Sequence, residues 1–167
     1  MKRNIVLYAV ILIMVLSGCK GCSFSKGFSK DLNTKLSVTY NGFTAERFAL
    51  VDANMQPLKD NRVQGNSSFS LVAYNIANYT LADNKAYPAC EMTLNDDAGK
   101  TLLHAPDIFA EKAPDGVSAE NGKYVTVTAT YTIPAALKGK TLHAIVRVTD
   151  RKNPGNVILM KDDVIVQ

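Results

Sequence analysis

Two stretches in the second half of the chain alternate strictly between apolar and polar side chains, and this alternation constrains the fold more than any other feature. In residues 124–133, apolar side chains alternate with threonines, and in residues 141–149 they alternate with polar ones that include His143 and Arg147. Because successive side chains of a strand point to opposite faces of a sheet, each stretch predicts a strand with one buried face. The residues expected inside are Val125, Val127, Ala129, Tyr131, Leu142, Ala144, Val146 and Val148.

Shorter segments elsewhere predict further strands of the same kind. Residues 36–40 alternate and are followed by Asn41-Gly42, a strong hairpin signal that makes 43–51 the expected returning strand. Other strands are expected at 69–76, 89–95, 101–104 and 157–166, and residues 105–121 form the one long irregular stretch. Because no segment of real length has a helical period, we expect an all-β, two-sheet antiparallel sandwich. The 157–166 strand is a plausible edge that could add to a partner's sheet.

The join between residues 133 and 142 runs Ile-Pro-Ala-Ala-Leu-Lys-Gly-Lys-Thr-Leu. It resembles the crossing between strands E and F of immunoglobulin-like and fibronectin-type sandwiches, where a tyrosine often stands at the position that Leu142 holds here. The resemblance extends over about residues 35–167 and implies an immunoglobulin-like or transthyretin-like sandwich. The chain contains no Trp, which excludes a true antibody-type domain.

The first residues have the layout of a secretory leader. Lys2 and Arg3 precede an unbroken apolar run over residues 5–16. A membrane-spanning helix needs about 20 apolar residues, so this run is a poor permanent anchor.

Leu16-Ser17-Gly18-Cys19 follows that run and resembles the lipobox of bacterial lipoproteins. The resemblance implies cleavage after Gly18 and diacylation of the Cys19 sulfur, and Lys20 in the next position implies retention in the outer membrane, on its periplasmic face or at the cell surface. The expected organisation is a leader over 1–18, a lipidated Cys and flexible tether over 19–33 and a sandwich over 34–167. An ordinary signal peptide with a chance cysteine is the alternative.

The net charge and the cysteines limit which partners and which covalent links we expect. Removing a leader with two basic residues and no acid lowers the formal net charge from +4 to +2, so we expect no nucleic-acid partner. Cys90 shares an alternating face with Met92 and Leu94, which indicates a small buried hydrophobe. A disulfide between Cys22 and Cys90 would suit an oxidising compartment, but nothing in their spacing supports it.

Residues that could carry chemistry are few and scattered. His104 and His143 have no metal-ligand spacing, and Asp96-Asp97 fits a turn better than a calcium loop. We therefore expect no metal, no cofactor and no catalytic residue, although convergence in space of His104, Asp107 and His143 would favour an enzyme. A sugar-stacking platform or a protein anchor could be built from the tyrosines Tyr74, Tyr79, Tyr87, Tyr124 and Tyr131, although core positions are the more ordinary explanation.

These expectations together describe a lipid-anchored, non-catalytic envelope protein that binds a partner protein. In its short leader, single sandwich and lack of active-site residues it is similar to the anchoring lipoprotein of the type VI secretion membrane complex. A surface-exposed carbohydrate-binding or adhesin-like lipoprotein is the alternative, and the partner-binding residues are not defined by the sequence.

Overall fold

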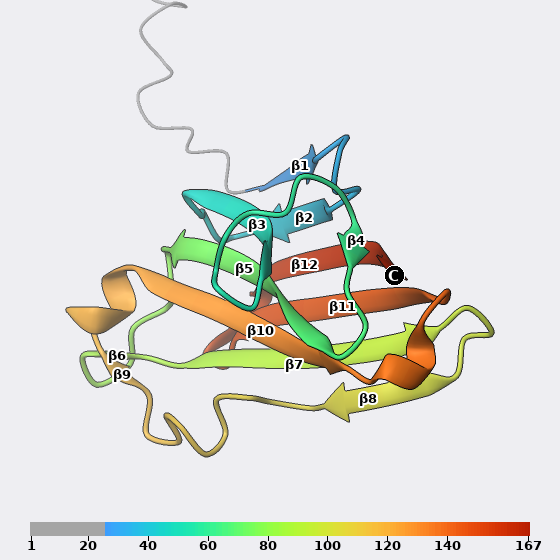
Figure 1. Cartoon of the computed structure of the whole chain (residues 1–167). Coiled ribbons are helices and arrows are strands. Elements are labelled where there is room, and N and C mark those ends of the chain that lie inside the picture. Colours follow the sequence, from blue (N-terminus) through green and yellow to red (C-terminus); the bar gives the residue numbers. More distant parts are fainter. Residues whose placement is uncertain (1–25) are drawn as a thin grey trace, which may run out of the picture.

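The computed structural model describes residues 26–167 of the chain, drawn in colour in Figure 1. The predicted leader, the cleavage position after Gly18, the lipidation site Cys19 and Cys22 lie outside the described residues. The described elements are β1 Lys26–Lys30, β2 Ser37–Asn41, β3 Arg47–Asp52, β4 Arg62–Val63, β5 Ser67–Ile76, β6 Lys85–Ala86, β7 Pro88–Asp96, β8 Thr101–Ala105, β9 Val117–Ser118, the short 3-10 helix η1 Asn121–Lys123, β10 Val125–Ile133, the 3-10 helix η2 Ala135–Leu137, β11 Thr141–Asp150 and β12 Asn153–Val166.

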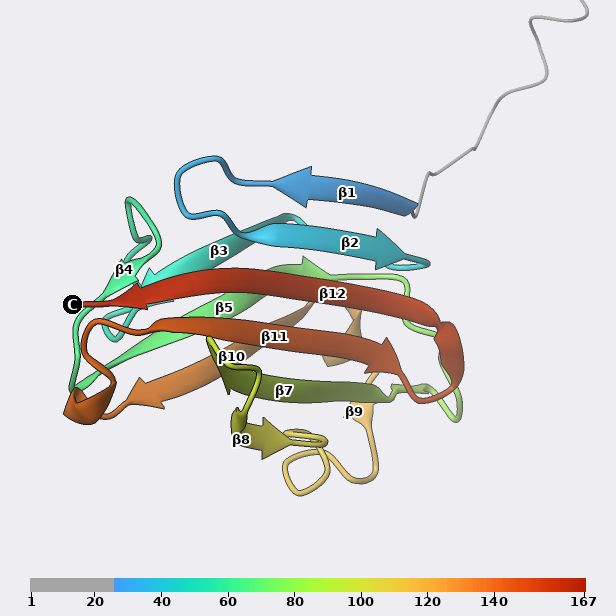
Figure 2. The ribbon, with the colours of Figure 1, turned by 90° about the vertical axis from the view of Figure 1, so that its right-hand side faces the viewer.

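The strands form two facing sheets, and Figures 1 and 2 show the two layers from sides at right angles. The larger sheet has the order β1-β2-β12-β11-β7-β8, and β4 pairs with the end of β12. The smaller sheet has the order β10-β5-β3, and β6 pairs with β9 apart from both. Apart from the short parallel pair β4–β12, these pairings are antiparallel. The predicted all-β antiparallel sandwich is confirmed.

The strand order is that of an immunoglobulin-like sandwich. In that layout strand B pairs with E in one sheet, and strand F lies between C and G in the other. Here β5 pairs with β10, and β11 lies between β7 and β12. Between β10 and β11 the chain passes through η2 from the smaller sheet to the larger, which is the crossing that the 133–142 segment predicted.

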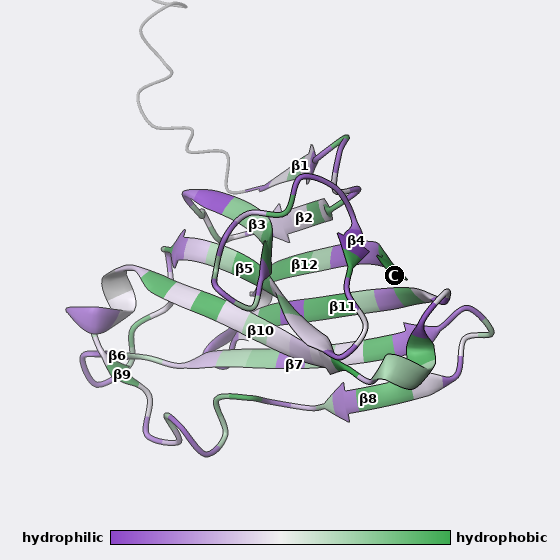
Figure 3. Cartoon of the chain, in the orientation of Figure 1, coloured by the Kyte–Doolittle hydropathy of each residue, from purple (hydrophilic) through white to green (hydrophobic). Residues whose placement is uncertain are grey.

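The core forms between the inward faces of the two sheets. Every residue expected inside β10 and β11 is buried, and the bands of alternating hydropathy along these strands are visible in Figure 3. Tyr131 is fully buried and stacks on Phe69 of β5, with ring centroids 5.1 Å apart. Its hydroxyl donates a hydrogen bond of 3.0 Å to the backbone carbonyl of Ile145 on β11. This bond joins the smaller sheet to the larger one through the core.

The hairpin predicted at Asn41-Gly42 is wrong. β2 pairs with β1 and β12 in the larger sheet, whereas β3 pairs with β5 in the smaller one. The turn carries the chain between the sheets because Phe43, immediately after it, is fully buried in the core. Gly42 has a φ of +75°, and a β-carbon there would overlap the side chain of Asn156, so glycine is required at this close approach.

Strand β1 lies inside the segment that the sequence predicted as a flexible tether. It pairs along its length with β2, from Lys26 opposite Asn41 to Lys30 opposite Ser37. The strand has no apolar alternation because it is an edge strand with both faces largely exposed. Gly27 fits against the ring of Tyr40, where a β-carbon would overlap the ring.

The prediction that residues 157–166 form an edge strand is also wrong. β12 pairs with β11 on one side and with β2 on the other, so its backbone groups already have partners. The sequence pattern did not reveal this because the hairpin expected at Asn41-Gly42 would have paired β2 with the strand that follows it, whereas β2 lies beside β12. In the larger sheet the edge strands are β1 and β8.

Removing the hydroxyl of Tyr131 tests how the two sheets are joined. We expect Tyr131→Phe to lower the free energy of unfolding by about 1 kcal/mol, because the substitution removes a buried hydrogen bond while keeping the ring. Urea unfolding measures the change, and Tyr87→Phe serves as the control because that ring packs under the ammonium of Lys152 and not in the core. Equal stability of Tyr131→Phe and the wild-type protein would contradict a contribution from this bond.

Candidate binding surface

Several connections gather at one end of the sandwich. β5 and β11 end there, and β7, β10 and β12 begin there, as their antiparallel registers require. The loops 77–84 and 106–116 and the β11–β12 turn therefore lie at the same end. In immunoglobulin-like variable domains the corresponding end carries the binding loops. β1 also begins here, because Lys26 lies opposite Asn41 at the end of β2.

The long connection between β8 and β10 is held in place by Asp107. One carboxylate oxygen accepts hydrogen bonds from the backbone N–H groups of Cys90 (3.0 Å) and Phe109 (2.9 Å). The other oxygen lies 3.0 Å from the guanidinium of Arg151, and both side chains of this ion pair are largely shielded from solvent. Further along, β9 pairs with β6. The loop that the sequence singled out is therefore a fixed part of the surface.

Asp150 fixes the neighbouring loop in a similar way. Its buried carboxylate accepts hydrogen bonds from the backbone N–H groups of Thr80 (2.6 Å) and Lys152 (2.8 Å). Asn156 donates a hydrogen bond of 3.0 Å to the carbonyl of Asn78. These bonds tie the β5–β6 loop to the β11–β12 turn, so the loops of this end form one connected platform.

Tyr124, immediately before β10, lies on this platform with 58% of its surface exposed. Two depressions, of about 490 Å³ and about 430 Å³, adjoin it, and both are lined by Ala77 and Tyr124. Leu81 is also exposed beside the second depression. We call these residues the Tyr124 surface, lined by Thr44, Ala45, Glu46, Asn75, Ala77, Asn78, Tyr79, Leu81, Ala119, Gly122 and Tyr124.

The shape and chemistry of the Tyr124 surface suit a partner's side chain or a flexible segment. Both depressions are shallow, whereas sites for small molecules enclose most of their ligand. Ala45 and Ala77 line the first depression together with Tyr124, and the Glu46 carboxylate, which accepts a hydrogen bond from the Asn75 amide, adds a polar group. An exposed aromatic anchor with a polar rim is typical of protein interfaces.

The five tyrosines considered as a platform do not form one. Tyr131 and Tyr79 are buried in the core. The guanidinium of Arg47 covers the ring of Tyr74 at 3.9 Å from its centroid, and the ammonium of Lys152 lies 4.4 Å from the centroid of Tyr87. Strand alternation placed Tyr131 correctly. The same alternation, with Val125 inside, puts position 124 on the outer face, but it does not show the depressions beside the Tyr124 ring.

The residues whose convergence would have favoured an enzyme remain apart. His143 on β11 pairs with Asp163, with Nδ1 and Oδ1 2.6 Å apart, and His104 on β8 lies 3.2 Å from the hydroxyl of Thr93. Strand β7 separates the two histidines, while Asp107 is held by Arg151. Within residues 26–167, no group of three or more His, Cys, Asp or Glu residues is arranged to hold a metal ion.

Cys90 and Asp96 have the structural environments that the sequence suggested. Cys90 is fully buried, and burial, followed by the nearby charge of Asp107, raises the pKa of its thiol to about 12. Asp96 accepts hydrogen bonds from the backbone N–H groups of Ala98 (3.0 Å) and Lys100 (2.8 Å). Cys90 is therefore a poor nucleophile, and Asp96 stabilises a turn.

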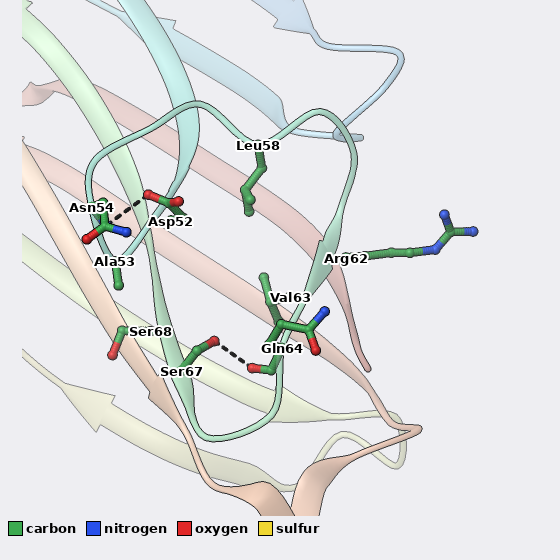
Figure 4. A pocket seen from close by; sticks show the side chains of 9 residues that line it. All are labelled: Asp52, Ala53, Asn54, Leu58, Arg62, Val63, Gln64, Ser67 and Ser68. Atoms are coloured by element: carbon green, nitrogen blue, oxygen red, sulfur yellow. Dashed lines mark hydrogen bonds between the residues drawn. The ribbon is translucent and has the colours of Figure 1, made fainter.

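A further cavity, of about 340 Å³, lies beneath the segment that connects β3 to β5, as Figure 4 shows. Asp52 accepts hydrogen bonds from the backbone N–H groups of Asn54 and Gln56, and the hydroxyl of Ser67 donates to the carbonyl of Gln64. The side chain of Arg62 points away from the cavity. Because these polar groups satisfy one another, the cavity is better explained as the space under a loop than as a binding site.

Asp162 is a carboxylate whose burial the sequence analysis did not predict. It lies on the inward face of β12 with 3% of its surface exposed, and neither carboxylate oxygen has a hydrogen-bond partner among the described residues. Burial raises its pKa to about 7, and the charge of the adjacent Asp163 adds to the shift. Alternation along β12 was the available signal, because it places position 162 on the same face as Met160 and Val164.

Comparison with known proteins adds little to this description. No protein-family model matches the sequence, and no curated protein matches it. Among solved structures, the chain is similar to the C-terminal domain of wzt, with a TM-score of 0.46 and 8% sequence identity over 85% of this chain and 78% of that one. Among the described residues, no helix is long and apolar enough to cross a membrane.

The burial of Asp162 predicts how stability depends on pH. The unfolded chain releases this proton near the ordinary pKa of 3.8, whereas the folded protein keeps it up to about pH 7. The contribution of Asp162 to stability therefore falls as the pH rises from about 4 to 7, and then levels off. We expect Asp162→Asn to be more stable than the wild-type protein at pH 8, by about 2–4 kcal/mol, and to differ little from it at pH 3.

Urea unfolding of both proteins across this pH range measures the effect. Asp97→Asn is the matched control, because Asp97 is exposed in the turn between β7 and β8 and the same change of charge there should leave the pH dependence nearly intact. The account is contradicted if wild type and Asp162→Asn lose stability in parallel between pH 4 and 7.

Proposed function

We propose that this protein is a lipid-anchored, non-catalytic envelope protein that holds a partner protein close to the membrane. The anchor in this proposal is an acylated Cys19, which follows the lipobox-like Leu16-Ser17-Gly18. Three acyl chains, the usual number in lipobox lipoproteins, would bind a bilayer far more firmly than the single chain that gives only marginal binding. Lys20 supports retention in the outer membrane.

The observation that carries the partner-binding role is the Tyr124 surface. Tyr124 is more than half exposed and borders two shallow depressions, and the Asp150 carboxylate holds the 77–84 loop that lines them. A fixed surface loses little conformational freedom when a partner binds, which favours affinity. Tyrosine is also among the residue types that contribute most to interface energies.

The environments of the candidate chemical groups support a non-catalytic role. Asp107 holds a loop, His143 pairs with Asp163, and Cys90 is buried with a raised pKa. Nucleophilic catalysis needs a nucleophile and a base within hydrogen-bond reach. In its specific form, the proposal is a subunit that assembles with others as the anchoring lipoprotein of a type VI secretion membrane complex does.

A surface lipoprotein that binds carbohydrate is the second candidate. The same Tyr124 ring could stack on a sugar while Glu46, Asn75 and Asn78 supply hydrogen bonds to its hydroxyls. The dispersed positions of the other four tyrosines weaken this candidate, because sugar platforms usually need more than one ring.

A photo-crosslinking amino acid placed at position 124 tests the proposal in intact cells. We expect a discrete adduct with one envelope protein, and no such adduct when the crosslinker replaces Met55, an exposed residue in the loop after β3 at the opposite end of the sandwich. Tyr124→Ala should weaken binding of the purified partner by about tenfold or more, as removal of an interface anchor does.

A released form serves as the control for anchoring. In it, a cleavable secretory leader without a cysteine replaces residues 1–19, and we expect the yield of adduct to fall because the protein is no longer concentrated at the membrane. Equal adducts from positions 124 and 55 would contradict the proposed surface. Binding to a glycan array without any protein adduct would favour the carbohydrate candidate.

A further inference from the structure

One half of the outer face of the larger sheet combines positive charge with apolar side chains. Phe28 on β1 lies opposite Thr39 on β2. Thr39 lies opposite Leu159 on β12, and Leu159 lies opposite Arg147 on β11. In the adjacent row Lys30 and Lys161 flank Ser37. Paired residues point to the same side of a sheet, as do residues two apart on one strand. We call this set the basic face: Lys26, Phe28, Lys30, Arg147, Leu159 and Lys161.

The basic face is accessible to a partner. Phe28 is 64% exposed, the four cationic side chains are exposed, and Leu159 is half-buried. Leu32, in the turn after β1, is 77% exposed beside it. Large exposed apolar side chains gathered with cations on a strand indicate an interaction site.

The acidic groups near the basic face have partners of their own or lie at its margin. The Asp31 carboxylate accepts hydrogen bonds from the backbone N–H groups of Asn33 (2.8 Å) and Thr34 (3.0 Å), which hold its pKa below the ordinary value. Asp163 pairs with His143, and Glu91 lies beyond Arg147. These carboxylates stay charged, but they lie around the basic face and not within it, so its six residues carry four positive charges and no negative one. That set of charges is complementary to an anionic surface.

The position of the basic face in the chain identifies that surface. Lys26, at the start of β1, is the seventh residue after Cys19. Even fully extended, seven residues span at most about 25 Å, so an acyl group on Cys19 would keep β1 within that distance of the bilayer. Lysines near an anionic leaflet are attracted to it, and exposed apolar side chains such as Phe28 can enter the boundary between headgroups and acyl chains.

We propose that the basic face lies against the anionic phospholipid surface in which the protein is anchored. This inference rests on the lipidation of Cys19 proposed above. The contact would orient the sandwich: the larger sheet faces the membrane, while β10 and the adjacent Tyr124 belong to the side of the smaller sheet and remain available to a partner.

The absence of tryptophan from the sequence allows a direct test with a single fluorescent reporter. Phe28→Trp places the reporter on the basic face, and Leu103→Trp places it on β8, the opposite edge of the same sheet, where Leu103 is 38% exposed. The full-length lipidated protein is reconstituted into vesicles of phosphatidylcholine with or without phosphatidylglycerol, whose acyl chains carry bromine as the quencher. Flotation of the vesicles measures anchoring separately.

We expect stronger quenching at position 28 than at position 103, and more of it when phosphatidylglycerol is present. Adding Lys26→Glu and Lys30→Glu to the Phe28→Trp protein should reduce the membrane-contacting fraction by roughly tenfold or more, since each lysine near such a surface contributes about fivefold. These side chains are exposed on an edge strand, and thermal melting checks that the variants fold.

Equal quenching at positions 28 and 103 in protein that floats with the vesicles would overturn the orientation and leave the anchor intact. The same result for vesicles with and without phosphatidylglycerol would overturn recognition of anionic lipid. Failure of the protein to float would refute the lipid anchor and, with it, this inference.

Discussion

The apolar faces of β10 and β11, pressed together across the sandwich, are the constraint on which the rest of the structure depends. Because one strand lies in the smaller sheet and the other in the larger, their alternating side chains form the centre of the core. The hydrogen bond from the Tyr131 hydroxyl to the Ile145 carbonyl joins them at a fixed position. This arrangement places the start of β10 and the end of β11 at the same end of the sandwich, and so brings Tyr124 beside the loops held by Asp107 and Asp150.

Alternation of apolar and polar residues predicted the strands well because successive side chains of a strand with one buried face are alternately buried and exposed. Val125 and Val127, like Leu142 and Ala144, lie inside because a strand with one buried face cannot shift its register by one residue without exposing them. Pairing between strands was harder to predict. Asn41-Gly42 has the composition of a hairpin turn, but the burial of Phe43 directs the chain to the other sheet. β1 was missed because an edge strand exposed on both faces carries no periodic signal.

The buried carboxylates show which parts of the candidate site were accessible from the sequence. Asp107 accepts a hydrogen bond from the backbone N–H of Cys90, 17 residues away, and Asp150 accepts one from Thr80, 70 residues away, and no local pattern predicts those partners. The burial of Asp162 could be predicted from alternation along β12. Its raised pKa could not, because that depends on the lack of a hydrogen-bond partner for the carboxylate among the described residues. Tyr124 could be named among the tyrosines but not distinguished as a binding residue, because the depressions beside it are lined by residues from segments distant in the sequence.

The proposed function combines the lipobox-like segment, which lies outside the described residues, with two surfaces that lie within them. If Cys19 is acylated, the basic face and the Tyr124 surface acquire distinct roles, one toward the membrane and one toward a partner. The most direct measurement is mass spectrometry of the N-terminal peptide of the protein purified from its native membranes. The account predicts a peptide that begins at Cys19 and carries the mass of a diacylglyceryl group on the sulfur and of a third acyl group on the α-amine. A peptide that retains the leader, or one that begins elsewhere and has no acyl mass, would contradict it.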